Sequence, residues 1–362
     1  MNKKINSPGF KIKLDYLIVL IYLIVFSIRF FSDIPKNISG ILYFASGCIC
    51  LIYCYCQKSA RRKKIRTILF IDAISCIVAL MNGNNTIVDA LYVIAAQAFG
   101  FLLYKQKNKI RFTQLILGII FLYVAFRVFF IPDVDRYGDI CLSPLCGKNT
   151  VSIIMMFSFS VDLIYRKLHD EQPNYFYVVI GILCSFITDS SGGILGFAML
   201  GIGIFCCKNR EKLAWRRIVF YGSFGILILM LSGQYVKIID FFSDDNSRFA
   251  IWKMYLSLAD NNFKSVLLGA DISQNHVLYH LFNIHNNFLN WHCYFGLIPF
   301  IAYSVILIYI ASMYIKRKDW YMLVIWIALF VRSLTDGTDF CFMSIWMYMY
   351  LDVNCTKMKI RY

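Results

Sequence analysis

Twelve separate apolar segments run along this chain, each about as long as a helix that crosses a lipid bilayer. A membrane-spanning helix needs about 20 mostly apolar residues, and such segments occupy residues 14–31, 38–56, 66–81, 86–104, 112–131, 149–165, 175–190, 192–207, 218–236, 287–315, 320–334 and 339–355. Only 16% of the residues are charged and 59% are hydrophobic, which excludes a soluble globular domain. We therefore expect an all-α, polytopic integral membrane helix bundle of about 12 transmembrane helices, in a single transmembrane domain over residues 1–362.

The loops between these segments alternate in charge. Of the 37 Lys and Arg residues, 27 precede the first segment, follow every second segment or end the chain. Basic residues concentrate in the cytoplasmic loops of membrane proteins, so this pattern predicts that both termini are cytoplasmic. The formal net charge of +16 is then a signal of orientation and gives no support for nucleic acid as a partner.

The longest outer loop covers residues 237–286 and is expected to be periplasmic. Loops of this length in a compact protein are usually functional or contain structure of their own. Within it, residues 247–259 are predicted to form a helix, because Phe249, Trp252 and Leu256 recur on one helical face.

Three arginines lie near the outer ends of the first, fifth and eleventh segments: Arg29, Arg127 and Arg332. Ionisable groups at membrane depth are costly and often functional. Either each arginine reaches the outer headgroups or pairs with an aspartate, or the arginines form a cluster. A cluster would suit a diphosphate, because guanidinium binds phosphate oxygens in a planar two-point fork.

Four of the five histidines fall between residues 276 and 292. His276 and His280 have the spacing of a metal-binding pair on a helix, but no third ligand is evident, so neither a metal nor another cofactor is expected. His285 ends the long outer loop, where a histidine can take a proton from an attacking hydroxyl. The alternative, a loop histidine hydrogen-bonded to the start of a helix, is equally well supported by the spacing.

A cysteine pair and two polar turns lie in the shorter connections that are expected on the outer side. Cys141 and Cys146 could form a disulfide if this face is periplasmic; we favour the bridge over two free thiols. The Ser-Ser-Gly-Gly turn at 190–193 either contacts a lipid headgroup or is a simple tight hairpin. The turn at 336–339, Asp-Gly-Thr-Asp, is similarly polar.

Several strings follow one another around the long loop. An Arg-x-x-x-Trp string opens it with Arg248 and Trp252, and a Leu-Gly-Ala string follows at 268–270. A His-Asn-x-x-Leu string at 285–289 then leads into a span with an early glycine, Gly296. In this order and spacing the chain resembles the bacterial O-antigen polymerase and ligase superfamily, which contains the Wzy-type polymerases and the O-antigen ligases. The resemblance covers roughly residues 180–335, and the first half only as a pattern of spans.

This resemblance implies a repeat-unit polymerase of the bacterial inner membrane, a metal-independent glycosyltransferase that works at the periplasmic face. The donor would be a growing glycan on undecaprenyl diphosphate, the acceptor another lipid-linked repeat unit, and the product O-antigen or capsular polysaccharide. On the matching positions, His285 is the candidate base and Arg248 the candidate diphosphate ligand. Arg127 and Arg332 are further candidates for the same charge.

The same resemblance suggests contacts outside the reacting groups. Asn286, Trp252 and Asp271 are candidates for contacts with the glycan or within the loop. Expected partners are the lipid-linked oligosaccharide, membrane lipid and a separate chain-length regulator protein.

Two other functions compete with polymerisation. A flippase for lipid-linked oligosaccharide also has about twelve spans, but it is expected to have shorter outer loops and paired halves, and no twofold pattern of spans is visible here. An O-antigen ligase shares the loop motifs and differs in its acceptor, lipid A–core. Many members of the superfamily have Ser-Arg-Gly where this chain has Asp-Ser-Ser-Gly at 189–192, and the missing arginine favours a polymerase.

Overall fold

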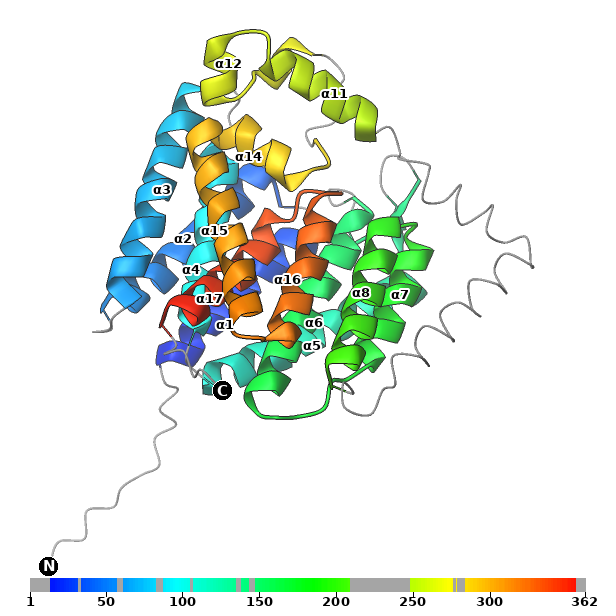
Figure 1. Cartoon of the computed structure of the whole chain (residues 1–362). Coiled ribbons are helices and arrows are strands. Elements are labelled where there is room, and N and C mark those ends of the chain that lie inside the picture. Colours follow the sequence, from blue (N-terminus) through cyan, green and yellow to red (C-terminus); the bar gives the residue numbers. More distant parts are fainter. Residues whose placement is uncertain are drawn as a thin grey trace, which may run out of the picture.

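The computed structural model describes residues 14–31, 34–56, 61–82, 87–104, 107–134, 138–142, 147–208, 248–275, 278 and 284–355 (Figure 1). The helices of the first part are α1 (Leu14–Phe31), α2 (Lys36–Cys56), α3 (Arg61–Met81), α4 (Ile87–Leu103), α5 (Lys107–Phe130), α6 (Asn149–Leu168), α7 (Phe176–Ile187) and α8 (Ser191–Lys208). Those of the second part are α11 (Arg248–Ala259), α12 (Phe263–Leu268), the 3-10 helix η1 (Ile272–Gln274), α14 (Asn287–Phe295), α15 (Leu297–Lys316), α16 (Trp320–Ser333) and α17 (Asp339–Cys355). The predicted all-α class is confirmed for these residues.

Four described helical segments are long and apolar enough to cross a membrane: Ile38–Cys56, Ile110–Phe130, Ser191–Lys208 and Leu297–Lys316. Four shorter helices are also apolar: Tyr16–Phe31, Ile87–Leu103, Phe176–Ile187 and Trp320–Ser333. Large apolar side chains such as Ile41, Phe70 and Ile119 are more than half exposed on the helix surfaces, as lipid-facing side chains are. The chain is therefore an all-α membrane protein.

The number of spans and their orientation in a membrane stay predictions. The predicted span 218–236 lies outside the described residues, as do residues 237–247 of the long loop. Each of the other predicted spans contains a described helix.

The predicted span 287–315 is wrong in one respect, because it is divided into two helices at Gly296. This glycine has φ +73°, a left-handed conformation that residues with a Cβ adopt only at a cost. A Cβ at Gly296 would also lie 2.5 Å from the carbonyl oxygen of Leu267. Figure 1 shows α14 running at an angle to α15, close to α12. The segment α14 therefore packs with the described part of the long loop, and the apolar run becomes a membrane-length helix only from Leu297.

Contacts between helix ends place alternate connections at opposite ends of the bundle. At one end, Lys167 pairs with Asp319, joining the end of α6 to the start of α16. At the other end, which we call the site end, Ser190 donates a hydrogen bond to the Asn149 side chain, and Arg332 donates to the Asn149 carbonyl. These contacts fix which helix ends lie together; which end faces the cytoplasm stays a prediction.

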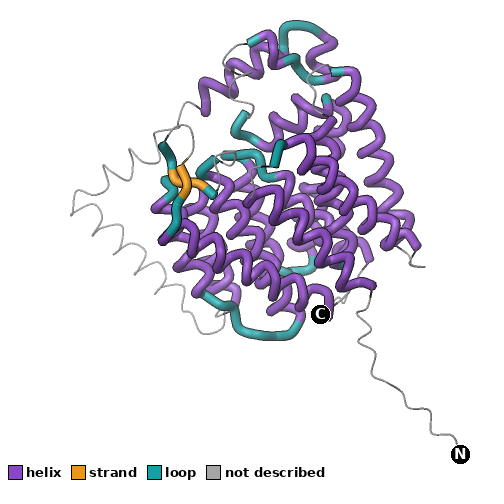
Figure 2. Tube along the Cα trace, turned by 180° about the vertical axis from the view of Figure 1, so that it is seen from behind, coloured by secondary structure: helices purple, strands orange, loops and turns teal. Residues whose placement is uncertain are grey.

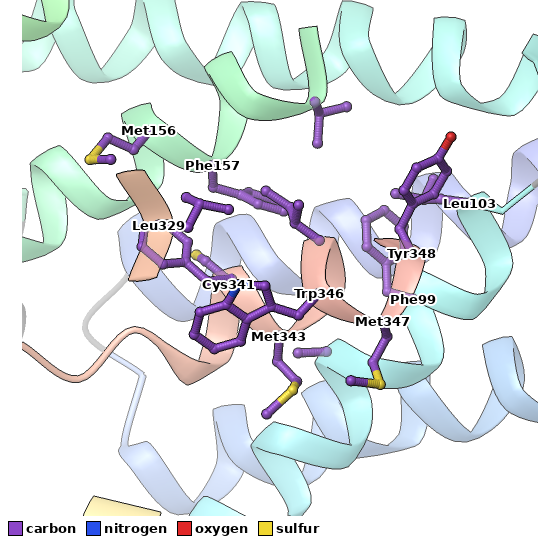
Figure 3. Close-up of a cluster of buried hydrophobic side chains, with 14 of the residues drawn as sticks. Phe99, Leu103, Met156, Phe157, Leu329, Cys341, Met343, Trp346, Met347 and Tyr348 are labelled. Carbon is purple, nitrogen blue, oxygen red and sulfur yellow. The ribbon is translucent and has the colours of Figure 1, made fainter. Parts of the chain in front are cut away.

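The helix α17 forms the centre of the bundle, and residues 341–351 are all buried. A helix that is apolar on all sides is typical of such a position. Gly100 of α4 allows a close approach, since a Cβ there would lie 2.1 Å from the Ser344 carbonyl oxygen. Figure 3 shows side chains of α17 among those of α4, α6 and α16: Cys341, Met343, Trp346, Met347 and Tyr348 with Phe99, Leu103, Met156, Phe157 and Leu329. Two of these neighbours, α6 and α16, carry polar side chains to the site end.

A short antiparallel hairpin lies between α5 and α6 (Figure 2). Its strands are β1 (Asp133–Val134) and β2 (Ile140–Cys141), with Asp133 opposite Cys141. Lys148 joins the hairpin to the site end through Asp139, at 3.3 Å, and Asp189, at 3.1 Å. Partial burial alone would lower the pKa of Lys148, but its hydrogen bonds to these two carboxylates raise the pKa overall, so the ammonium stays charged.

Candidate functional site

Residues 248–275, 278 and 284–286, the described part of the long loop and its last residues, fold over the site end. An apolar cluster holds them there, formed by Ile251, Tyr255, Ala259, Ala270, Leu278, Ile284 and Cys293. Asn82, just after α3, donates hydrogen bonds to the carbonyl oxygens of Leu268, at 3.0 Å, and Cys293, at 2.5 Å. Gly269 of the Leu-Gly-Ala string has φ +88°, and a Cβ there would lie 2.4 Å from the Cys293 carbonyl oxygen. The string therefore requires glycine, because the loop packs directly on the backbone of α14.

His285 lies at the start of α14 and faces the end of α16. Its φ of +52° is unusual for a residue with a side chain, and strained backbone often marks functional positions. Its side chain is 27% exposed, and its Nδ1 lies 3.6 Å from Oδ1 of Asp336. Asn286 fixes this position: its Oδ1 accepts hydrogen bonds from two backbone N–H groups of the first turn of α14, and its Nδ2 donates to the Leu334 carbonyl oxygen at 3.2 Å.

Arg332, in the last turn of α16, is completely buried. Its Nη1 donates to Thr335 Oγ1 at 2.9 Å, and its Nη2 donates to Ser152 Oγ at 3.2 Å and to the Asn149 carbonyl oxygen at 3.4 Å. The Nε has no hydrogen-bond partner among the described residues. A buried charge needs a counter-charge, and Asp336 Oδ2 supplies it at 3.6 Å.

Asp336 therefore lies between the imidazole of His285 and the guanidinium of Arg332. Its carboxylate is 3.6 Å from each group and its residue is 4% exposed. The backbone N–H of Gly337 donates to its Oδ1 at 2.8 Å, which fixes the carboxylate in the turn. Such a carboxylate can orient a histidine and stabilise it when it takes up a proton.

The turn between α7 and α8 packs against the same arginine. Ser190 Oγ lies 3.0 Å from Ser152 Oγ, and both serines contact Asn149. A Cβ at Gly192 would lie 3.2 Å from Arg332 Nη1. The turn is the tight hairpin that one of the two interpretations predicts, and its glycine leaves room for the guanidinium.

Arg248 begins α11, and its side chain is partly exposed. Its charge acts on that of Arg332, so the two guanidinium groups lie within electrostatic range of each other. The fold thus brings Arg248, His285 and Arg332 to one end of the molecule from widely separated parts of the chain.

The three predicted glycan or loop contacts all have partners in the protein. Trp252 Nε1 donates to the Ile284 carbonyl oxygen at 3.0 Å, which holds α11 over the loop. Asp271 Oδ1 accepts from the Ser273 backbone N–H at 3.0 Å and caps η1. Asn286 caps α14, as described above. Contact of these side chains with a glycan remains a prediction.

Arg127, the third predicted diphosphate ligand, is bound within its own loop. It pairs with Asp133 and donates to the carbonyl oxygens of Ile131, at 3.2 Å, and Leu142, at 3.3 Å. Its Nη1 also donates to the Tyr123 hydroxyl at 3.3 Å. These contacts are those of an arginine that stabilises the β1–β2 hairpin.

Two further predictions concern Arg29 and the disulfide between Cys141 and Cys146. Arg29 lies over the rings of Phe30 and Tyr92, 5.7 and 5.3 Å from their centroids, an arrangement that stabilises a cation without phosphate. Cys146 lies outside the described residues, so its disulfide with Cys141 stays a prediction.

No group of three or more His, Cys, Asp or Glu in the described ranges is arranged to hold a metal ion. His276 and His280 lie outside those ranges. His292 joins three helices, because its Nδ1 is 2.7 Å from the Tyr255 hydroxyl and its Nε2 is 2.7 Å from the Val266 carbonyl oxygen. Burial raises the pKa of Tyr255, so its hydroxyl keeps its proton.

A wide-open surface pocket of about 690 Å³ lies beside α11, α12 and α14. Its lining includes Phe249, Trp252, Leu256, Lys253 and Asp260. Aromatic faces next to charged side chains can accommodate the apolar and polar sides of a sugar ring.

Sequence reasoning missed the side chains that surround Arg332. The sequence identifies Asp336 only as a member of a polar turn and does not predict its pairing with Arg332. Its spacing of four residues from Arg332 is nevertheless that of a helical ion pair. Nothing in the local sequence marks Asn149 or Ser152, which reach Arg332 from a helix distant in the chain.

Comparisons with known protein families, with curated proteins and with solved structures found no match to this chain. Function must therefore be inferred from the motifs and from the geometry of the site end.

Proposed function

We propose that this protein is a membrane glycosyltransferase that polymerises oligosaccharide repeat units carried on undecaprenyl diphosphate. It would act at the periplasmic face of the bacterial inner membrane and produce O-antigen or capsular polysaccharide. The observation that carries the proposal is the grouping of His285, Asp336 and Arg332 at one end of the bundle, with Arg248 in electrostatic range.

Each of these groups has a role in the proposed reaction. A hydroxyl of the acceptor sugar attacks the anomeric carbon of the donor glycan, and a new glycosidic bond forms. The bond between that carbon and the diphosphate oxygen breaks, and undecaprenyl diphosphate leaves with the electron pair. His285 takes the proton of the attacking hydroxyl, and Asp336 stabilises the resulting imidazolium.

The leaving diphosphate needs cations more than it needs acid catalysis, because it is already a good leaving group. Arg248 is partly exposed and can bind it directly. The buried Arg332 contributes positive potential and an Nε without a partner among the described residues. Fixed cations of this kind stabilise developing charge without reorganising during the reaction.

Arg332 also offers an explanation for the arginine that this chain lacks in the turn at 189–192. The turn at 189–192 lacks the arginine of the Ser-Arg-Gly string, yet the Arg332 guanidinium lies against Gly192 of that turn. We propose that Arg332 supplies from α16 the positive charge that other members have in the turn.

Deletion of the gene tests the function. A polymerase null is expected to carry surface polysaccharide of core plus a single repeat unit on a gel. A ligase or flippase null would instead show no attached repeat, and normal ladders would reject all three functions.

The role of His285 is tested with His285→Ala. Loss of a general base costs about 100-fold to 10,000-fold in rate, so long chains should disappear while membrane insertion, followed by fluorescence-detected gel filtration, is unchanged. The matched control is His169→Ala, because the His169 side chain lies at the opposite end of α6, where it contacts the Tyr165 carbonyl oxygen and the Tyr165 ring. Full ladders from the inserted His285→Ala protein would remove His285 from catalysis.

A further inference from the structure

A second polar cluster lies inside the bundle, between α3, α4 and α15. It consists of Asp72, Ser75, Gln97 and Tyr303, and each of these residues is 3% exposed or less. The Tyr303 hydroxyl donates to Asp72 Oδ1 at 2.6 Å, and Gln97 Nε2 donates to the Tyr303 oxygen at 3.2 Å. Ser75, one turn after Asp72, lies within hydrogen-bonding reach of Tyr303. The function proposed above uses none of these side chains.

Two buried oxygens of this cluster have no hydrogen-bond partner among the described residues: Asp72 Oδ2 and Gln97 Oε1. Both are acceptors, and neither can donate to the other. A buried acceptor without a partner costs about 1–3 kcal/mol. A proton on Asp72 or a cation bound in the cluster would supply a partner that these oxygens lack.

The charge of Asp72 also calls for a proton or a bound cation. In the described part of the chain, no Lys, Arg or His forms an ion pair with it. The ionisable side chains that interact with it there are Tyr303 and, on its own helix, Cys76, and both are ordinarily neutral. An isolated carboxylate at such depth is strongly disfavoured unless it is neutralised.

Asp162 shows how a second buried carboxylate is neutralised within the protein. Its side chain is also completely buried, but Arg166 Nε lies 2.7 Å from its Oδ2, and Gln114 Nε2 donates to its Oδ1 at 2.8 Å. Both of its oxygens and its charge are therefore satisfied. Asp72 has neutral neighbours, Tyr303 and Gln97, and no cation among its described partners.

We propose that Asp72, Gln97 and Tyr303 form a binding site for a small monovalent cation, either a proton or a sodium ion. A proton on Asp72 would neutralise the carboxylate and give it a donor. A sodium ion would be held by oxygens alone, which hard cations prefer, and the cluster offers carboxylate, amide and hydroxyl oxygens. Buried acids of this kind in membrane proteins mark sites for protons and ions.

The two ions are distinguished by infrared spectroscopy and sodium binding on the full-length protein in lipid nanodiscs. If the ligand is a proton, the spectrum contains a protonated carboxylic-acid band that Asp72→Asn removes. If it is sodium, the protein binds radioactive sodium saturably, and Asp72→Asn abolishes the binding. An ionised Asp72 without saturable sodium binding would overturn the proposal.

Two variants keep the result interpretable. Asp162→Asn is the matched control and should leave both the acid band and sodium binding unchanged, since Arg166 already neutralises that carboxylate. Tyr303→Phe keeps Asp72 and removes one oxygen, so it should shift the acid band or weaken sodium affinity. An unmoved band together with unchanged sodium affinity in Tyr303→Phe would place the signal on another residue and reject the site.

Discussion

Arg332 and Arg127 end two different helices, and the sequence predicts the same ligand for both, but their surroundings differ. All described partners of Arg127 lie between residues 123 and 142, in its own helix end and hairpin. The partners of Arg332 include Ser152 and Asn149 of α6 as well as Asp336, and its side chain has no exposed surface. One arginine stabilises a local hairpin, and the other joins distant helices at a shared point.

The two arginines illustrate two roles that a partly or fully buried positive charge can have. A cation held by neighbours in sequence makes a local turn stable. A cation held between distant helices is fixed in position by the whole bundle, and such preorganisation is what electrostatic catalysis requires. The comparison therefore supports the proposed functional role of Arg332 and a structural role for Arg127.

The largest effect is expected from Asp336→Asn. The substitution removes the carboxylate beside His285 and leaves the buried Arg332 without its counter-charge. Breaking a buried ion pair costs about 3–5 kcal/mol, so both the thermal stability of the purified protein and polymer formation should fall sharply. Asp189→Asn is the control, because that side chain is 64% exposed and pairs only with Lys148 among the described ion pairs. Equal stability of the two variants would show that Asp336 does not neutralise Arg332.

Arg332→Lys should have the next largest effect, mainly on activity. A lysine keeps the charge but has a single nitrogen, whereas the guanidinium contacts Thr335 with Nη1 and both Ser152 and Asp336 with Nη2. We expect about a 100-fold loss of polymerisation rate, the size seen when one preorganised charge-stabilising donor is removed. The measurement is chain extension with a purified lipid-linked repeat unit. Wild-type rates would contradict a role for the positioned guanidinium.

Arg248→Lys should weaken activity less, by about tenfold. Arg248 is partly exposed, so a lysine can still approach a diphosphate from solvent but loses the two-point contact. The loss should be greatest at low concentrations of the lipid-linked donor and smaller at saturation, because binding is affected. Lys264→Arg on the neighbouring helix α12 is the control, because that side chain is exposed and does not line the pocket beside α11. Unchanged chain lengths over all donor concentrations would remove Arg248 from the diphosphate site.

The helices could be predicted from the sequence because length and apolar composition are local properties. Every predicted span that the structure describes contains a helix, including α17, whose apolar surface explains its central place. The break at Gly296 could not be predicted, because glycine inside an apolar helix is common in membrane proteins. It depends on the close approach of Leu267, which only the folded loop provides.

The candidate site was predictable in part for the same reason. His285 and Arg332 stand out because each is an ionisable group at a recognisable place in the pattern of spans, whereas Arg248 stands out through the resemblance to the polymerase and ligase superfamily. Their grouping, and the position of Asp336 between two of them, depends on how α6, α14 and α16 pack. Likewise, Arg127 has the same local signals as Arg332, and only its tertiary partners distinguish the two.

The smallest effect on activity is expected from Arg127→Gln, and it is the sharpest test of the comparison. The substitution removes the ion pair with Asp133 and hydrogen bonds to the hairpin backbone. Because the pair is partly exposed, the cost should be about 1 kcal/mol or less of stability, seen as a slightly lower melting temperature. Chain extension should change by less than about twofold, since none of Asn149, Ser152, His285 and Asp336 is among the described partners of Arg127. A loss of activity as large as that of Arg332→Lys, in protein that is normally inserted, would show that Arg127 acts on the diphosphate and that local partners do not exclude a functional role.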